Sequence, residues 1–256
     1  MNRTSLALVS CVASLLAPAA FAADPSAGKI VDRNVAARGG LAAWRAVDTL
    51  TLAGEMDAGG KKDMKLPFVF KMKRPNKSRL ELRFEDRTAV QTYDGRQGWK
   101  FRPFLGRDDV DAFTPAEARS AAAADELDGP LVDHERKGTR VELVGMDKVE
   151  GKSTYKLKLT KKTGETRNLW VDAGSFLEVK IDGEPRRLDG KLHAVAIFYR
   201  DFKPEGQLVL PHTLETVVDG VKQSHTMAIK TVTFNPALAD AQFSKPDATL
   251  ATAAAQ

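Results

Sequence analysis

The sequence predicts a mainly β protein of about eleven antiparallel strands with two or three helices, most simply one strongly curved sheet or incomplete barrel. The first observation is an alternation of apolar and polar residues over positions 64–84. Such a period of two is typical of strands, because successive side chains leave opposite faces of a pleated chain. The second is a series of strand-like runs between residues 139 and 234, joined by short connections of which several contain glycine. The third is that helix signals are confined to residues 24–47 and 114–127.

Residues 64–84 predict a long antiparallel hairpin with one apolar and one basic face. Bulky apolar side chains occupy even positions on both sides of the turn at residues 74–77: Met64, Leu66, Phe68, Phe70, Met72, Leu80, Leu82 and Phe84. Most odd positions are charged, and the basic ones are Lys65, Lys71, Lys73, Arg79 and Arg83. Pro67 lacks an N–H group, so we expect it at a sheet edge or a bulge.

The helices are predicted from their end signals. Asp24 is a plausible N-cap for a first helix, which ends at the glycine pair 39–40, and a shorter helix follows over 41–47. Thr114-Pro115-Ala116-Glu117 is a capping box and starts a helix that extends to Leu127. This helix contains four consecutive alanines, so it offers little surface for packing and is either a lid or a crossover.

The remaining strands are predicted from alternation and turn residues. A strand starts at Thr49, a loop occupies residues 104–109, and a loose tail follows Phe243. The further strands are expected at 87–93, 97–102, 139–149, 153–161, 166–171, 176–181, 192–202, 207–218 and 221–234. Asp219-Gly220 predicts a two-residue hairpin turn before the last of them.

Residues 1–22 have the pattern of a secretory signal peptide. Arg3 precedes an apolar run, and Ala20-Phe21-Ala22 is a small-residue cleavage site. Leu8-Val9-Ser10-Cys11 resembles a lipobox, in which the cysteine would carry a lipid, but only about six apolar residues precede Cys11. We therefore favour cleavage after Ala22, which leaves a mature chain without cysteine. Residues 23–243 are expected to form one domain and residues 244–256 a flexible tail.

Charge is concentrated in the predicted hairpin. The 256-residue chain has a net charge of +5, while residues 61–87 contain six lysines and four arginines against four acids. This basic face is either a solvated strand surface or a docking patch for anionic lipid headgroups or an envelope protein. Nucleic acid is not expected as a partner, because no recognition motif accompanies the charge.

No motif predicts catalysis, a cofactor or a metal site. The four histidines, His134, His193, His212 and His225, lack metal-ligand spacing, and the acidic loop at 108–111 lacks the pattern of a calcium site. Residues 145–153 superficially resemble a phosphate-binding loop, but five residues separate the two glycines and strands flank the turn. We expect a protein that is not an enzyme and needs no cofactor.

Several motifs together resemble the outer-membrane lipoprotein-sorting-like proteins, the LolA/LolB-like superfamily. They are residues 39–50, beginning Gly-Gly-Leu-Ala-Ala-Trp, Arg74 to Arg79, Tyr93 to Trp99, Asp128 to Asp133, and the strand series from Gly145 to Lys180. The resemblance extends over about residues 30–243 and implies a half-open antiparallel barrel with covering helices. It also implies a Gram-negative periplasmic location and a concave apolar face that receives acyl chains.

The function depends on whether the apolar face of the hairpin is filled core or the wall of a cavity. Periodicity alone is compatible with both, whereas the resemblance favours the cavity. We then expect a non-enzymatic binder or carrier of acyl chains, from a lipoprotein or another envelope lipid, lined by the eight apolar hairpin residues and Trp99. The alternative is an RseB-like envelope sensor that contacts a protein through the basic face.

Overall fold

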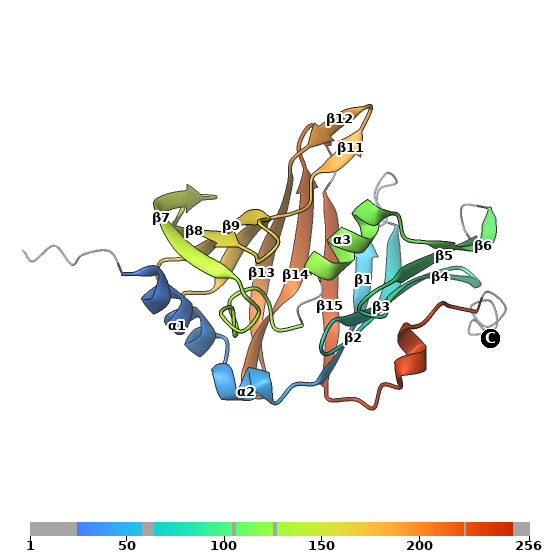
Figure 1. Cartoon of the computed structure of the whole chain (residues 1–256), viewed down its shortest axis with the longest axis horizontal. Helices are drawn as coiled ribbons and strands as arrows, with labels where there is room; N and C mark the ends of the chain where they lie inside the picture. The colour runs from blue at the N-terminus through green and yellow to red at the C-terminus, as the bar shows by residue number, and fades with distance from the viewer. Residues whose placement is uncertain (1–24, 58–63, 104–105, 125–126, 223, 248–256) are drawn as a thin grey trace, which may run out of the picture.

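An antiparallel sheet of thirteen strands that is not closed into a barrel dominates the fold (Figure 1). The computed structural model describes residues 25–57, 64–103, 106–124, 127–222 and 224–247. The strands of the sheet are β1 (Thr49–Asp57), β2 (Lys65–Lys73), β3 (Lys77–Phe84), β4 (Arg87–Tyr93), β5 (Gly98–Arg102), β6 (Arg107–Ala112), β7 (Arg140–Val149), β8 (Lys152–Thr160), β9 (Thr166–Asp172), β10 (Glu178–Asp182), β13 (Val195–Glu205), β14 (Leu208–Val218) and β15 (His225–Phe234). The helices are α1 (Ala27–Ala37), α2 (Leu41–Arg45), α3 (Pro115–Ala124) and the short 3₁₀-helix η2 (Asp240–Phe243). The prediction of a mainly β, half-open curved sheet with covering helices is confirmed.

The chain builds one half of the sheet from the centre to an edge and the other half from the opposite edge back to the centre. The strand order is β6-β5-β4-β3-β2-β1-β15-β14-β13-β10-β9-β8-β7, so β1 and β15 pair in the centre and β6 and β7 form opposite edges. Between β6 and β7 the chain therefore has to cross from one edge to the other, and α3 lies on that connection. In Figure 1 α3 lies in front of the strands, while α1 and α2 flank the other half of the sheet.

Most of the core lies on one face of the sheet, which we call the inner face. One cluster joins β1 and β2 to α2, including Leu50, Phe68 and Trp44. A second cluster joins α1 to the other half of the sheet and includes Ile30 and Leu157. The strand registers place both clusters on the same face, because residues directly opposite each other in a ladder share a face.

The predicted hairpin is formed by β2 and β3 with the expected register. Phe68 pairs with Leu82 and Phe70 with Leu80, so the apolar even positions share the inner face. β2 lies inside the sheet, between β1 and β3, so the expectation of an edge strand at Pro67 was wrong. Pro67 is accommodated because the β2–β3 pairing begins only at Phe68, one residue further along.

Several element boundaries differ from the sequence prediction. The N-cap of α1 is Ser26, whose Oγ accepts a hydrogen bond from the Lys29 N–H at 3.4 Å. Part of the expected loop at 104–109 belongs to β6, and β11 (Arg186–Leu188) and β12 (Lys191–His193) form a separate two-stranded hairpin. This hairpin projects beyond the sheet in Figure 1. The chain turns at residues 219–220 as expected, but β15 begins only at His225.

The capping box of α3 is present. The Thr114 N–H donates to Glu117 Oε2 at 2.8 Å, and the Glu117 N–H donates to Thr114 Oγ1 at 3.2 Å. Lys100 Nζ, on β5, lies 2.5 Å from Glu117 Oε1 and attaches the first turn of α3 to the inner face. Burial tends to raise the pKa of Glu117, but the bonds from Lys100 and Thr114 outweigh it and lower this pKa.

A buried polar network joins the helices to the sheet. Arg38 Nη1 lies 3.1 Å from Glu178 Oε1 and donates to the Asp128 carbonyl oxygen at 2.9 Å. The Asp128 carboxylate is 2.8 Å from Arg74 Nη2, and Arg74 Nη2 also donates to the Trp44 carbonyl oxygen. Residues from three separate sequence motifs, around Trp44, Arg74 and Asp128, therefore meet at one place.

Candidate functional site

The apolar residues of the hairpin divide into a packed group and a half-buried group. Phe68 is 2 % exposed and Met72 is 6 % exposed, and both belong to the core. Half-buried are Met64, Leu66, Phe70, Leu80, Leu82 and Phe84. Phe68 and Met72 are therefore filled core, whereas Phe70, Leu80 and Leu82 pack against that core and keep part of their surface accessible on the inner face.

The half-buried residues continue across neighbouring strands as one apolar surface. Met56 of β1 pairs with Leu66 on one side and with Met227 of β15 on the other. We call the half-buried set Met56, Leu66, Phe70, Leu80, Leu82 and Met227 the inner strip. Two methionines among these six residues make the inner strip adaptable, because unbranched thioether side chains repack easily.

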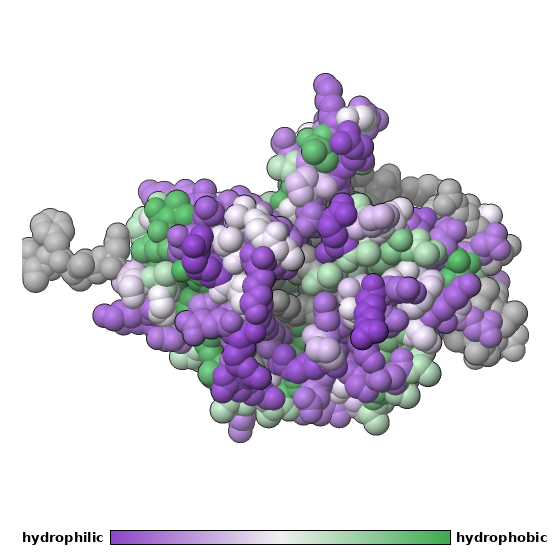
Figure 2. All heavy atoms as spheres, viewed as in Figure 1, coloured by the Kyte–Doolittle hydropathy of each residue, from purple (hydrophilic) through white to green (hydrophobic). Residues whose placement is uncertain are grey.

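Helix α3 lies on the inner face beside the inner strip. It is attached by the Lys100–Glu117 ion pair near its start and by Asn76 Nδ2, which donates to the Ala122 carbonyl oxygen at 3.4 Å. Its sequence PAEARSAAAA contains no large apolar side chain that would fill the space between helix and strands. In Figure 2 the same side of the molecule shows a band of weakly hydrophobic, pale green residues where α3 lies.

Trp99 lies on the opposite face of the sheet. It pairs with Thr92, which pairs with Arg79, and Arg79 pairs with Lys71 of the basic row. Trp99 therefore does not share a surface with Phe70 and Leu80, although the sequence pattern grouped them together. We call the face that carries Trp99 and Arg79 the outer face.

The basic row of the hairpin is used largely within the chain. Lys73 Nζ donates to the Leu238 carbonyl oxygen at 2.8 Å and lies 2.8 Å from Asp240. Arg79 lies 2.5 Å from Glu81 Oε1 and donates to the Gln242 carbonyl oxygen at 3.0 Å. These contacts hold the segment around η2 against the outer face.

The other three basic residues differ in how they are used. Lys71 lies 3.7 Å from Glu81, while Lys65 and Arg83 are exposed.

The acidic residue of the C-terminal segment is held in its charged form. Hydrogen bonds from Lys73 and Lys77 lower the pKa of Asp240 to about 2, so this carboxylate is charged at neutral pH.

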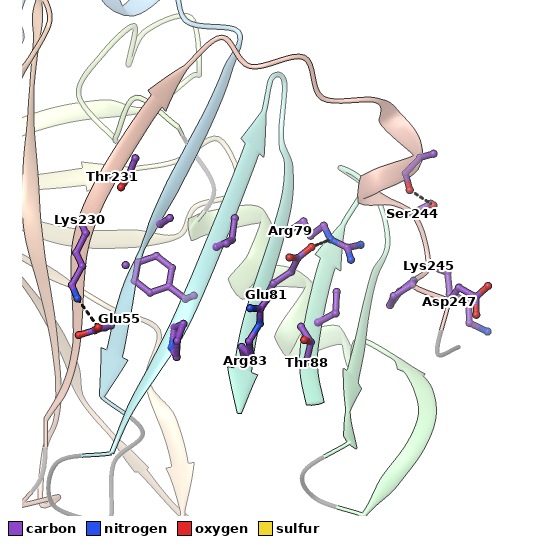
Figure 3. Close-up of a pocket in the computed structure, with 18 residues that line it drawn as sticks. Glu55, Arg79, Glu81, Arg83, Thr88, Lys230, Thr231, Ser244, Lys245 and Asp247 are labelled. Atoms are coloured by element: carbon purple, nitrogen blue, oxygen red, sulfur yellow. Dashed lines mark hydrogen bonds and ion pairs between the residues drawn. The ribbon is translucent and has the colours of Figure 1, made fainter. Parts of the chain in front are cut away.

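The C-terminal segment and the outer face enclose a groove of about 650 Å³, which we call the outer groove (Figure 3). Its floor includes Ala53, Val69 and Val90, which lie in one row across β1, β2 and β4. The segment from Ala241 to Asp247 forms one wall, and Pro246 within it is buried. No sequence pattern predicted this groove, because residues 244–247 were expected to belong to a flexible tail. Residues 248–256 of that expected tail lie outside the described residues.

Neither a metal centre nor a membrane-spanning helix is found in the described part of the chain. No three His, Cys, Asp or Glu side chains there are grouped so that they could hold a metal ion. No helix within the described ranges is long and apolar enough to span a bilayer. The predicted signal peptide and Cys11 lie outside the described residues.

Comparison with solved structures identifies the fold. A LolA superfamily protein from Nitrosomonas europaea superimposes with a TM-score of 0.54 at 16 % identity, covering 86 % of this chain and 98 % of that one. A domain provisionally described as an outer membrane lipoprotein-sorting protein, from Vibrio parahaemolyticus, gives a TM-score of 0.55 at 13 % identity and covers 88 % and 97 %. A DUF1329 family protein from Desulfovibrio piger gives 0.56 at 14 % identity, covering 86 % and 97 %.

The similarity lies in structure and not in overall sequence. No protein-family model matches the chain, and no curated protein matches it significantly. The structural matches cover nearly the whole of each neighbour, so the chain has the LolA-like fold that the sequence motifs predicted.

Proposed function

We propose that this chain, whose fold is LolA-like, is a non-enzymatic periplasmic protein that binds or carries acyl chains on its inner face. The acyl chains would come from a lipoprotein or another envelope lipid and lie along the inner strip under α3. The observation that carries the proposal is the half-buried apolar surface of the inner strip next to a helix made largely of alanine.

The energetics of this surface favour a hydrocarbon ligand. Each acyl CH₂ group transferred from water to an apolar surface contributes about 0.8 kcal/mol, so a chain can bind without a specific polar contact. The inner strip supplies apolar side chains from β1, β2, β3 and β15, which gives an extended hydrocarbon several strands to lie across. The side chains of α3 are small, so the helix contributes little apolar volume of its own above the inner strip.

The attachment of α3 supports a role as a lid. The described contacts that hold it to the sheet are polar and lie near its two ends, at Glu117 and at Ala122. The Lys100 side chain is 10 % exposed and that of Glu117 is 39 % exposed, and displacement of α3 would return both charges to water. A helix buried by large apolar residues would instead have to expose those residues in order to move. Displacement of α3 would therefore uncover the inner strip at low cost.

The alternative of an envelope sensor that contacts a protein through the basic face has less support. Lys73 and Arg79, two of the five basic residues in that row, bind the C-terminal segment of the chain itself. Lys65 and Arg83 remain exposed, which is a smaller cationic surface than the sequence indicates.

The inner-strip proposal is tested by substituting Leu82, which is half-buried and paired with Phe68 at the edge of the core. Leu82→Asn places an amide where the acyl chain would lie. We expect the affinity for a fluorescent fatty acid to fall roughly tenfold, because binding would bury a polar group that lacks good hydrogen-bond partners. Leu192→Asn is the matched control, because Leu192 is 65 % exposed on the projecting β12. Phe68 is unsuitable for this test, because its substitution would damage the core.

Binding in the control but not in Leu82→Asn, with equal thermal stability of both, would support the proposal. Native mass spectrometry of the protein isolated from the periplasm should also show a bound lipid. An empty protein with no uptake of the probe would contradict it. The same spectra test the location: a mature chain that begins at Ala23 is expected, and a lipid-modified Cys11 would contradict the predicted cleavage.

A further inference from the structure

The outer groove is hollow because small residues occupy the outer face at this point. Ala53 is directly opposite Val69 on this face. The neighbouring row carries Pro67, whose ring extends only a short distance from the strand. Long side chains stand at the rim, among them Arg83, Lys230 and Lys245, so the groove combines an apolar floor with a charged border (Figure 3).

Two polar groups in the outer groove lack partners within the described residues. Thr88 is 7 % exposed, and its Oγ1 makes no hydrogen bond there. Arg83 is directly opposite Thr88 in the β3–β4 ladder and makes no ion pair or hydrogen bond with the described part of the chain. Opposite residues of an antiparallel pair have Cβ atoms about 5 Å apart, so one small group can reach both side chains. A buried hydroxyl without a partner is costly unless something satisfies it.

The remaining charges of the outer groove largely neutralise each other. Lys230 Nζ lies 2.5 Å from Glu55 Oε1, and Arg79 is paired with Glu81. The hydrogen bond from Lys230 lowers the pKa of Glu55, so that pair is charged on both sides at neutral pH. Among the cations that the strands contribute to the outer groove, Arg83 is therefore the one without a counter-ion in the described ranges. The C-terminal segment adds Lys245 and Asp247, which have opposite charges, so the electrostatics favour a ligand with one negative charge.

We propose that the outer groove binds a carboxylate amphiphile, of which a free fatty acid is the simplest example. The carboxylate lies between the Arg83 guanidinium and the Thr88 hydroxyl, both of which donate to it, and the hydrocarbon part lies along Val69 and Val90. A volume of about 650 Å³ suits one ligand of this size and is too small for a protein partner. Acyl chains linked by ester or amide bonds lack the free carboxylate, so they would not use Arg83.

This site is separate from the inner strip, because the two lie on opposite faces of β2 and β3. A stearic acid with a nitroxide label on its chain distinguishes them in the full-length mature protein. The label broadens the NMR signals of nearby methyl groups: those of Val69 and Val90 report the outer groove, and those of Leu80 and Leu82 report the inner strip. The methyl ester of the same labelled acid provides a ligand without the negative charge.

The proposal predicts that the labelled acid broadens the Val69 and Val90 signals and that Arg83→Gln weakens this effect about tenfold, as expected for loss of one charge-assisted hydrogen bond. Arg186→Gln, an exposed arginine on β11, should leave the affinity unchanged. The methyl ester should bind the groove weakly in wild type and equally weakly in Arg83→Gln. Ala53→Leu places a larger side chain on the floor of the groove. It should abolish the broadening of the Val69 and Val90 methyl signals and leave the broadening of the Leu80 and Leu82 signals unchanged.

Three results would overturn the proposal. The first is broadening at Leu80 and Leu82 alone, which would leave the inner-strip function intact. The second is groove binding that is equal for acid and ester or unaffected by Arg83→Gln, because the carboxylate would then have no role. The third is no broadening on either face, which would contradict both proposals.

Discussion

The buried ion pair between Arg38 and Glu178 makes the stability of the fold sensitive to a single charge. The two side chains are 7 % and 4 % exposed, and their closest nitrogen and oxygen atoms are 3.1 Å apart. Glu178→Gln retains the shape of the side chain but removes the counter-charge of a buried guanidinium. We predict that this substitution destabilises the protein far more than loss of an exposed ion pair.

The magnitude follows from what remains around Arg38. Removing one partner of a buried ion pair costs about 3–5 kcal/mol, because the other charge is left without compensation. Arg38 keeps its hydrogen bond to the Asp128 carbonyl oxygen and its position 4.5 Å from the Trp44 ring centre. We therefore expect the lower end of that range, about 3 kcal/mol. For a domain of this size each kcal/mol lowers Tm by about 2–4 °C, which gives a decrease of roughly 6–12 °C.

Thermal and urea unfolding followed by circular dichroism measure this effect. Glu142→Gln is the matched control, because Glu142 pairs with Arg140 across 3.3 Å while the two side chains are 46 % and 68 % exposed. The control should change stability by less than about 0.5 kcal/mol. The double substitution Arg38→Met with Glu178→Leu should recover at least half of the loss, because Arg38 Nε and Glu178 Oε2 have no partner in the described structure. Equal Tm values for Glu178→Gln and Glu142→Gln would refute the reasoning.

Three further predictions concern other parts of the fold. The pKa of Asp240 is about 2 in the folded protein, below its ordinary value of 3.8, so its ion pairs with Lys73 and Lys77 add stability that is lost as the pH falls from about 4 to about 2. Asp240→Asn should therefore be less stable than wild type at pH 7 and equal to it near pH 2 in urea titrations; a pH-independent difference would contradict this. Phe68→Ala should cost about 3–5 kcal/mol, and a loss below 1 kcal/mol would show that this part of the inner face is not packed. Gly54→Ala should cost roughly 1–3 kcal/mol, because its Cβ would lie 2.0 Å from a carbonyl oxygen of β15, and unchanged stability would exclude this close approach.

The sequence was sufficient to predict the hairpin and its two faces. The phase of Phe68 and Phe70 on β2 continues in Leu80 and Leu82 on β3, and a slip of one residue would have moved all of them to the other face. Trp99 was grouped with them from its apolar character alone. Its face is fixed by the turn at Asp94–Gln97, where the Asp94 N–H donates to the Gln97 carbonyl oxygen and sets the β4–β5 register.

Other elements could not be predicted because their stability depends on contacts far apart in sequence. β11 and β12 carry exposed leucines and charged residues without a buried face, so alternation gives no signal there. The segment around η2 is alanine-rich and aperiodic, and it is held by pairs such as Lys73 with Asp240, separated by more than 160 positions. The outer groove exists only where that segment meets the sheet, so no local pattern could indicate it.

The two rows of the hairpin therefore have different roles from those that charge and hydropathy assign to them. The even row is core near Phe68 and Met72 and becomes the half-buried inner strip further from it. The odd-numbered residues are mostly basic, but Lys73 and Arg79 both donate hydrogen bonds to the C-terminal segment, and Lys73 also forms an ion pair with Asp240. Their charge is therefore not available to a membrane or a partner. Charge reversal at either position would release the wall of the outer groove as well as change the surface. A test of a docking role for the basic face consequently has to use Lys65, which is exposed and lies outside these contacts.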